Sequence, residues 1–422
     1  MFSNLRGLFS PTNKDLRKRI LFTIGCLALF ALGTNIIVPG AKSITDSLGF
    51  LELLNLMSGG GLKTFSIFAL GVMPYISASI ITQLFQMDII PYFKELKEQG
   101  ATGKQKLNRI NRYLGIFFAV IQGYVFSYAF LADAGSIEIV KTTLILTAGT
   151  AFLLWLGDEI TKKGIGNGIS LIIMAGIVNT LPHIFITAYQ DLVLGTTFTV
   201  WTGIILFALF VLIYLLIVVG IIYIQSAERR VTIQYSNRTT GAYGGEKSFI
   251  PIKLNSAGVI PVIFASAVIG VPSLLGQVIQ NEAFTKFVDN YIVYTSYSGF
   301  LIYMLLIFVF GYFYTLLQLN PDDMAENLDK NRSYIPGITP GEKTSKYLKY
   351  VISRITIIGT LFLMTLSALP IIFSGLTNLS SAAALGGTGL LIVVGVALET
   401  YKQLESSLVS RSYTGRRRRV RR

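Results

Sequence analysis

Residues 66–87 read SIFALGVMPYISASIITQLFQM, an uncharged and mostly apolar stretch that is long enough to cross a lipid bilayer as one helix. The residues before it, 55–65, read NLMSGGGLKTF, a short segment that is apolar on one side and interrupted by Gly59, Gly60 and Gly61. The chain therefore places a short, glycine-hinged segment directly before a membrane span, and this arrangement needs a structural or functional reason.

Segments like 66–87 recur along the chain, which has 422 residues, 52% of them hydrophobic and only 14% charged. Soluble domains contain about 25% charged residues. The uncharged apolar segments are 20–38 (with Cys26, the only cysteine), 67–87, 113–131, 142–156, 168–190, 201–224, 257–277, 299–319, 355–373 and 385–398. Because each crossing needs roughly 20 apolar residues, the sequence predicts an all-α polytopic membrane protein with ten transmembrane helices. The first segment exceeds the apolar core of a signal peptide, about 7–15 residues, and is expected to be a retained span.

The basic residues are distributed very unevenly between the two sides of this ten-span arrangement. All but four of the 36 lysines and arginines lie in the segments that share a side with both termini. The four on the opposite side are Lys42, Lys63, Lys141 and Lys286. Because basic loops stay in the cytoplasm, both termini are predicted to be cytoplasmic. Five spans in each half, 1–190 and 191–422, would orient the halves oppositely, as in an inverted repeat.

Charged side chains are absent from all ten predicted spans. Ion-coupled transporters normally keep an ionisable residue within the membrane, so a secondary transporter of a small solute is kept only as the alternative function. The acidic residues of 158–159 and 322–323 lie among basic residues in predicted loops and are expected to be solvated. His183 is the single histidine and is expected in a loop. The sequence therefore predicts no enzyme activity, no metal site and no cofactor.

The second span carries a patterned face. Val72, Ile76, Ser79 and Gln83 are spaced at i, i+4, i+7 and i+11, so they share one stripe of a helix that is apolar at one end and polar at the other. One interpretation is helix–helix packing with polar side chains as additional contacts. The other is the wall of an aqueous path that narrows to an apolar constriction. The glycine-rich motif GIGNGI (164–169) lacks the P-loop lysine and predicts a tight turn before span 5.

Six motifs stand out in the spans and loops. They are GGGLKTFSIFALGVMPYISASIITQL (59–84), TAFLLWLGDEITKKGIGNGISLIIMAGIV (150–178), IPIKLNSAGVIPVIFA (250–265), NPDDMAENL (320–328), SYIPGITPG (333–341) and GGTGLLIVVGVALETYKQLESSLV (386–409). In this order they resemble the bacterial SecY family, the channel subunits of the general protein translocase, over about residues 16–415. The resemblance implies a protein-conducting channel in a bacterial cell membrane. Such a channel moves unfolded secretory proteins across the membrane and releases membrane segments through a lateral gate.

The resemblance also assigns roles to residues around span 2. Residues from about 51 to 66 resemble the family's plug, a short re-entrant helix that seals the pore; the residues concerned are Leu56, Met57, Ser58, Gly59, Gly60, Gly61 and Leu62. A segment that seals a pore and also leaves it is expected to be short, weakly anchored and hinged, and to contribute little core. The family's ring of aliphatic pore residues corresponds to Val72, Ile76, Ile169, Ile173, Ile263 and Ile392. The lateral gate is expected where spans 2 and 7 lie against span 8, with Ser79, Gln83 and Asn255 along it.

The two large loops on the terminal side, 225–256 and 320–354, resemble the family's docking surface. The residues expected to contact partners are Arg229, Arg230, Arg238, Thr339, Lys343 and Lys346. The resemblance implies a SecA motor ATPase or a ribosome as partner, together with SecE-like and SecG-like small membrane subunits, signal sequences and the lipid bilayer. The basic tail RRRRVRR (416–422) is expected to bind anionic lipid or RNA, or to remain a solvated tail.

Three positions depart from the family pattern. Ala31 and Thr339 stand where the family usually has arginine, and Gly389 stands where it usually has serine near the pore ring. Threonine cannot make the bidentate contacts of arginine. We therefore expect this channel to bind a generic motor more weakly, and the departures suggest a specialised paralogue or a co-adapted partner.

Overall fold

The structure, a computed structural model, describes residues 14–40, 52–86, 90–131, 135–195, 199–235, 248–279, 281–293, 296–377 and 381–420. In chain order its helices are α2 (Lys14–Gly33), α3 (Glu52–Met57), α4 (Met73–Phe85), α5 (Pro91–Glu98), α6 (Gly100–Phe130), α7 (Ser136–Lys163), α8 (Gly168–Tyr189) with the π-helical turn η5 (Gln190–Leu194), α9 (Val200–Ser226), α10 (Ile260–Ile279), α11 (Glu282–Tyr291), α12 (Tyr297–Gln318), α13 (Pro321–Lys330), α14 (Glu342–Thr377) and α15 (Ser381–Val420). The strands are β1 (Glu228–Tyr235), β2 (Ser248–Lys253) and β3 (Ser333–Tyr334).

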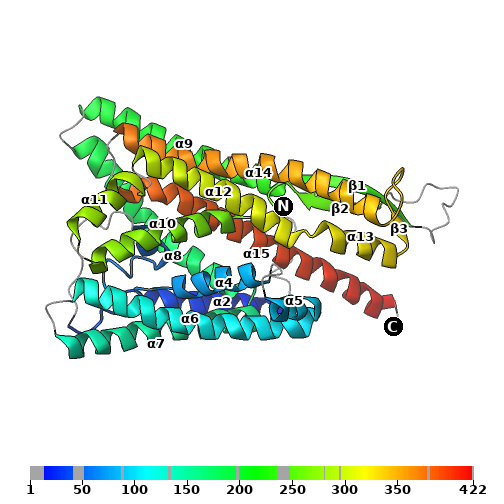
Figure 1. Cartoon of the computed structure of the whole chain (residues 1–422), viewed down its shortest axis with the longest axis horizontal. Helices are drawn as coiled ribbons and strands as arrows, with labels where there is room; N and C mark the ends of the chain where they lie inside the picture. The colour runs from blue at the N-terminus through cyan, green and yellow to red at the C-terminus, as the bar shows by residue number, and fades with distance from the viewer. Residues whose placement is uncertain are drawn as a thin grey trace.

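The helices of the two sequence halves form two groups that lie side by side along the long axis of the molecule (Figure 1). In the first group α6 packs on α4 and α7, and α2 packs on α7 and α8. In the second group α12 packs on α10 and α14. Helix α15 runs between the groups and contacts α3, α8, α9 and α14, so it joins the two halves.

Each predicted span overlaps one of these helices, but their ends differ from the prediction. Span 2 is helical only from Met73, because residues 67–72 form turns that connect it to the glycine-rich segment. Among the described residues, six helical stretches are long and apolar enough to cross a bilayer, namely 102–130, 136–163, 168–194, 200–226, 297–330 and 342–377.

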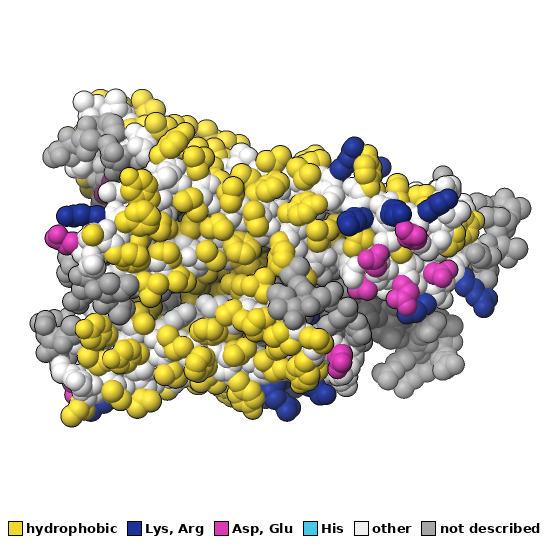
Figure 2. Space-filling view, viewed as in Figure 1, with side chains coloured by type: hydrophobic (Ala, Val, Ile, Leu, Met, Phe, Trp, Pro, Cys, Tyr) yellow, Lys and Arg dark blue, Asp and Glu magenta, His cyan; other side chains and the backbone are white. Residues whose placement is uncertain are grey.

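The surface of the helical body is apolar, as expected for a protein that faces lipid. Figure 2 shows hydrophobic side chains covering most of the visible face, whereas charged side chains gather mainly at the end where β1, β2, β3 and α13 lie in Figure 1. Large apolar side chains such as Trp201, Leu305 and Leu361 are more than half exposed. In water such a surface would be strongly unfavourable, so the exposure is consistent with membrane helices.

The prediction of an entirely α-helical protein is wrong at this charged end. Strand β1 pairs antiparallel with β2, with Val231 opposite Ile250, and with β3, with Gln234 opposite Tyr334. The three strands, α13 and the first part of α14 enclose their own apolar core, made of Val231, Ile233, Ile252, Leu328, Ile335, Leu348, Ile352 and Ile355. We call this unit the platform. The described parts of the two predicted loops, 225–256 and 320–354, are therefore folded together in one unit.

Three further expectations can be compared with the structure. The turn predicted at GIGNGI is confirmed: α7 ends at Lys163, Gly166 has a left-handed φ of 84°, and the Asn167 side chain caps α8 by accepting from the Ile169 amide. His183 lies within α8 rather than in a loop, because Pro182 is accommodated inside that helix. Residues 158–159 lie in α7 and 322–323 in α13, so neither acidic pair is in a loop.

Candidate functional site

A cavity of about 590 Å³ lies between the two groups of helices, and we call it the funnel cavity. Its lining includes the charged and polar residues Lys104, Asn108, Arg112, Asp158, Asn167, Ser170, Glu399 and Gln403. Arg112 Nη1 and Asp158 Oδ2 form an ion pair at 2.8 Å between α6 and α7, and both side chains are more than a third exposed. The same cavity also touches Ile76, Ile169, Ile173 and Ile263. Its wall therefore combines charged and aliphatic side chains.

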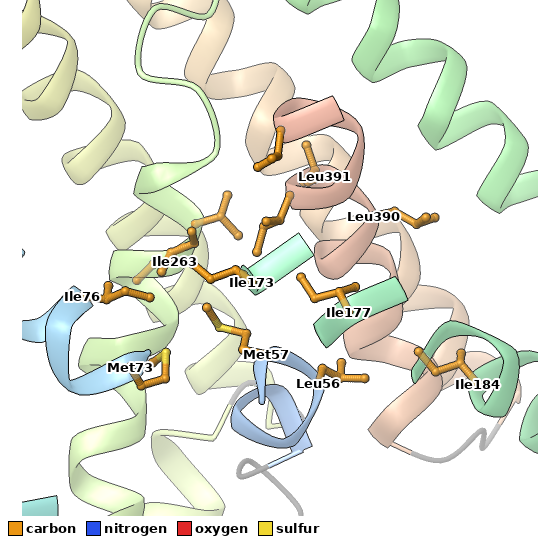
Figure 3. Packing of buried hydrophobic residues seen from close by; sticks show 14 of the residues in the cluster. Leu56, Met57, Met73, Ile76, Ile173, Ile177, Ile184, Ile263, Leu390 and Leu391 are labelled. Atoms are coloured by element: carbon orange, nitrogen blue, oxygen red, sulfur yellow. The ribbon is translucent and has the colours of Figure 1, made fainter. Parts of the chain in front are cut away.

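The structure brings the predicted pore-ring residues together. Val72, Ile76, Ile173, Ile263 and Ile392 are each at most 8% exposed and belong to one buried apolar cluster, against which Ile169 packs. We call the six residues the collar. They come from α4 and its preceding residue, from α8, from α10 and from α15, so both sequence halves contribute. Figure 3 shows Ile76, Ile173 and Ile263 near one another within this cluster.

Residues beyond the predicted ring extend the collar. Met73, Ile177, Leu390 and Leu391 belong to the same cluster (Figure 3). Ile177 follows Ile173 by four residues on α8, so helical periodicity could have identified it. Gly389, the departure from serine, lets α15 approach α8 closely, because a Cβ at this position would lie 2.9 Å from Ile177 Cγ2.

Residues 55–63, which we call the glycine segment, lie against this cluster. Leu56 and Met57 are 1% and 2% exposed and belong to the same cluster as the collar (Figure 3). Leu62 is also buried, in a second cluster with Val38, Phe65 and others. The expectation of a weakly packed segment with little core is therefore wrong. Its apolar side chains are buried by helices that are distant in the sequence.

The backbone of the glycine segment follows a compact turn. Gly59 and Gly60 have φ angles of 73° and 85°, in the left-handed region that only glycine adopts without strain. Ser58 Oγ donates to the Asn55 carbonyl at 3.0 Å, and the Lys63 amide donates to Asn55 Oδ1 at 3.0 Å. The segment is therefore held together by its own hydrogen bonds.

The chain after the glycine segment is fastened to the end of α2. Ser66 forms a β-bridge with Ile37, the Val38 amide donates to the Phe65 carbonyl at 3.0 Å, and the Ile67 amide donates to the Ile36 carbonyl at 2.9 Å. Any movement of the glycine segment would therefore take place upstream of this attachment.

The predicted gate residues occupy two places. Gln83 Nε2 donates to Ser79 Oγ at 3.2 Å on α4, and both side chains line the funnel cavity. Asn255 instead lines an adjoining cavity of about 470 Å³ and donates to the Gly258 carbonyl at 3.0 Å, before α10. A third cavity, of about 190 Å³, is lined by Gln83 and Gln86 of α4 and by Tyr314, Leu317 and Gln318 of α12. The α12 residues were missed, although Tyr314 and Gln318 form a polar i, i+4 pair.

Five of the six predicted docking residues are described, and all five are surface residues of the platform. Arg229 and Arg230 are exposed on β1, and Arg230 pairs with Glu228 at 2.8 Å and lies 4.7 Å above the Phe249 ring. Thr339 is exposed in the turn before α14. Lys343 and Lys346 are exposed at the start of α14, where Lys346 pairs with Glu342 at 2.8 Å. Arg238 lies outside the described residues, and within those residues no cluster of His, Cys, Asp or Glu could hold a metal ion.

Comparison with known proteins gives a consistent family. A family model described as SecY matches residues 66–401 of this chain. The protein translocase subunit SecY of Bacillus subtilis (strain 168) is 44% identical over 415 residues, which cover 95% of this chain and 96% of the relative.

Solved structures with low sequence identity share the fold. "The structure of a protein conducting channel" gives a TM-score of 0.66 at 19% identity, covering 94% of this chain and 93% of that one. A structure reporting that the plug domain of the SecY protein stabilises the closed state of the translocation channel gives 0.62 at 20% identity, with the same coverage. Sec61 in the canine ribosome–channel complex from the endoplasmic reticulum also gives 0.62, at 19% identity and with that coverage.

Proposed function

This chain belongs to the SecY family, the protein-conducting channel subunits of the protein translocase, and from this premise we propose that the collar is the constriction through which translocating chains pass. The observation that carries the proposal is the funnel cavity, whose lining combines charged side chains with aliphatic side chains from both halves of the chain. An aliphatic constriction excludes water and ions by dewetting and has no fixed hydrogen bonds to break when a chain enters. Family membership also removes the alternative of a small-solute transporter.

In this proposal the glycine segment is the plug. It supplies Leu56 and Met57 to the cluster that contains the collar, so it adds apolar contacts to the seal. It has no full membrane span of its own and is joined to α4 by turns. These features suit an element that leaves the pore without unfolding the helices around it.

The lateral gate is the seam between α4 and the pair α10 and α12. Two observations support this position: Ser79 and Gln83 of α4 face the funnel cavity, and polar residues of α4 and α12 share a cavity of about 190 Å³. Polar side chains along a seam can be hydrated when it opens, so parting the helices there costs little free energy. Signal sequences and membrane segments would pass through this seam to the lipid, and Asn255 would border its platform end.

The chain crosses the bacterial cell membrane ten times, as two inverted halves, with both termini and the platform in the cytoplasm. The charge distribution supports this orientation, since all but four of the 36 lysines and arginines then lie in the cytoplasm. The exposed threonines Thr285 and Thr339 allow a matched test. In a Cys26→Ser background, Thr285→Cys should react with an impermeant maleimide from outside and Thr339→Cys only from inside; the reverse pattern would refute the orientation.

Partners complete the channel. The exposed basic residues of the platform favour acidic or phosphate-bearing surfaces, so they suit a ribosome or a SecA motor ATPase. Canine Sec61, which shares the fold, was solved in a ribosome–channel complex. SecE-like and SecG-like subunits would cover part of the apolar outer surface. The chain itself performs no chemical step in this proposal, and the motor or ribosome supplies the energy.

A stalled secretory precursor provides the direct test. A photoreactive amino acid at Ile263 should crosslink to a precursor trapped during motor-driven translocation, whereas one at Leu146, buried in the second apolar cluster, should not. Equal crosslinking at both positions, or crosslinking at Leu146 alone, would show that the chain does not pass through the collar.

A further inference from the structure

The contact between the glycine segment and α8 is unusually close. A Cβ added to Gly176 of α8 would lie 2.7 Å from the Met57 carbonyl oxygen and 3.0 Å from the Gly59 amide nitrogen. A Cβ added to Gly59 would in turn lie 3.2 Å from Gly176 Cα. The two backbones therefore touch directly, and each requires glycine at the contact.

One turn further along α8, Asn179 adds a hydrogen bond to this contact. Its Nδ2 donates to the Gly59 carbonyl at 2.9 Å. Because positions 176 and 179 are three residues apart, they share one face of α8. The Asn179 side chain is exposed, so water can take over this hydrogen bond when the segment leaves.

The hydrogen bonds inside the glycine segment are of a different kind. Ser58 Oγ donates to the Asn55 carbonyl, and the Leu62 amide donates to Ser58 Oγ at 3.2 Å. Donor and acceptor of each bond therefore lie within the glycine segment. Departure from α8 therefore leaves these bonds intact, whereas it breaks the contacts at positions 176 and 179 and the apolar contacts of Leu56 and Met57. The segment can move as one unit, pivoting near its attachment to residues 36–38.

We infer that Gly176 and Asn179 form a seat on α8 that holds the glycine segment in place and sets how often the resting channel opens. This inference rests on the proposed role of the glycine segment as the plug. Helix α8 also carries Ile173 of the collar, one turn before Gly176, so the same helix supports the constriction and the element that covers it. Gly176 and Asn179 are positioning residues, since neither belongs to the collar.

The test measures resting ion conductance of the full-length chain, purified with its partner subunits and placed in planar bilayers. Asn179→Ala and Asn179→Asp both remove the donor and should raise the resting open fraction roughly two- to fivefold, the effect of losing one exposed hydrogen bond. Gly176→Ala should raise it further, because its methyl group displaces the segment backbone. Gly375→Ala on α14, where a Cβ would meet nothing within 4 Å, is the matched control and should conduct like the parent.

Two comparisons make the result decisive. The Asn179 variants should keep the parent's thermal unfolding temperature, so a leak in them cannot be ascribed to general destabilisation. If Gly176→Ala does not fold, the two Asn179 variants alone decide the question. If both Asn179 variants conduct like the parent while Ile76→Asn leaks, the seat is refuted and the collar stands. If Ile76→Asn also conducts like the parent, both the seat and the position of the constriction are refuted.

Discussion

The collar and the platform differ in how they are held together. The collar is formed by aliphatic side chains from four separate stretches of the chain, and its contacts are non-directional. The platform combines an apolar core with an antiparallel backbone ladder from Glu228–Lys253 to Ile233–Ser248. Side chains that only pack can part and close again, whereas a hydrogen-bonded sheet keeps its shape. The region that must open and the region that must present a fixed docking surface are therefore built from different interactions.

The largest effect should come from removing the glycine segment. Deleting residues 56–64 takes Leu56, Met57 and Leu62 out of two buried clusters. We expect a higher resting conductance than in any single-residue variant, acceptance of precursors with weakened signal sequences, and a lower unfolding temperature, since truncating one such buried side chain costs about 2–5 kcal/mol. Binding of the motor to the platform should be unchanged. If the deletion variant had the same resting ionic conductance as the parent, the segment would not seal the pore.

The converse variant weakens the platform and spares the collar. Leu348 is fully buried in the platform core, and Leu348→Ala should destabilise that unit by about 2–5 kcal/mol. We expect faster proteolysis of the platform and slower motor-driven translocation, with unchanged resting conductance. Leu361→Ala, at an exposed position of the same helix, is the control. An increased leak in Leu348→Ala would mean that platform and collar are mechanically coupled.

The sequence predicts the helices and the collar better than it predicts the platform. The helix positions were accessible because apolar length is a local signal. The collar residues were assigned through the family resemblance, with which the i, i+4 spacing of Ile169 and Ile173 agrees. The strands were not, since β3 has two residues and pairs with β1 about a hundred residues earlier. An analysis based on long apolar segments treats such stretches as loops.

The burial of the glycine segment could not be predicted from the sequence either. Met57 packs in a cluster with residues of α8 and α15, more than a hundred positions away, and short segments carry no signal of such contacts. The same limit explains why Asn255 was grouped with Gln83, although the structure places them in different cavities. The family resemblance suggested their shared role at the lateral gate, and the sequence carries no signal for which cavity each residue lines.

A smaller effect is expected at the tip of the platform. Thr339 is exposed, and its carbonyl accepts from Thr344 Oγ1 at 3.1 Å, which fixes the turn while leaving the side chain outside. Thr339→Arg should tighten binding of a generic SecA motor by about 1.5–3 kcal/mol, because a charge-assisted hydrogen bond becomes possible. The measurement is motor ATPase stimulation over a salt series, with Thr339→Ala as control. Equal stimulation by the arginine and alanine variants would exclude a contact at this tip.

The smallest effect should distinguish the two arginines of β1. Arg230 is engaged by Glu228 and Phe249, whereas the described residues show no ion pair for Arg229. Arg229→Ala should therefore weaken partner binding more than Arg230→Ala does, by up to about 1 kcal/mol, with the difference declining at high salt. Binding of a fluorescent motor or ribosome to proteoliposomes would measure it. Equal losses for both variants would indicate that the patch acts only through its total charge.

The central claim is that the aliphatic collar is the barrier to ions. The most direct measurement is the resting conductance of Ile76→Asn and Ile173→Asn in planar bilayers, compared with Ile76→Leu and Ile173→Leu at the same positions. Asparagine wets an apolar constriction, whereas leucine keeps it dry at nearly the same volume. We predict a clear ionic leak in both asparagine variants and parental conductance in both leucine variants. Parental conductance in the asparagine variants, with the proteins folded and inserted, would contradict the claim.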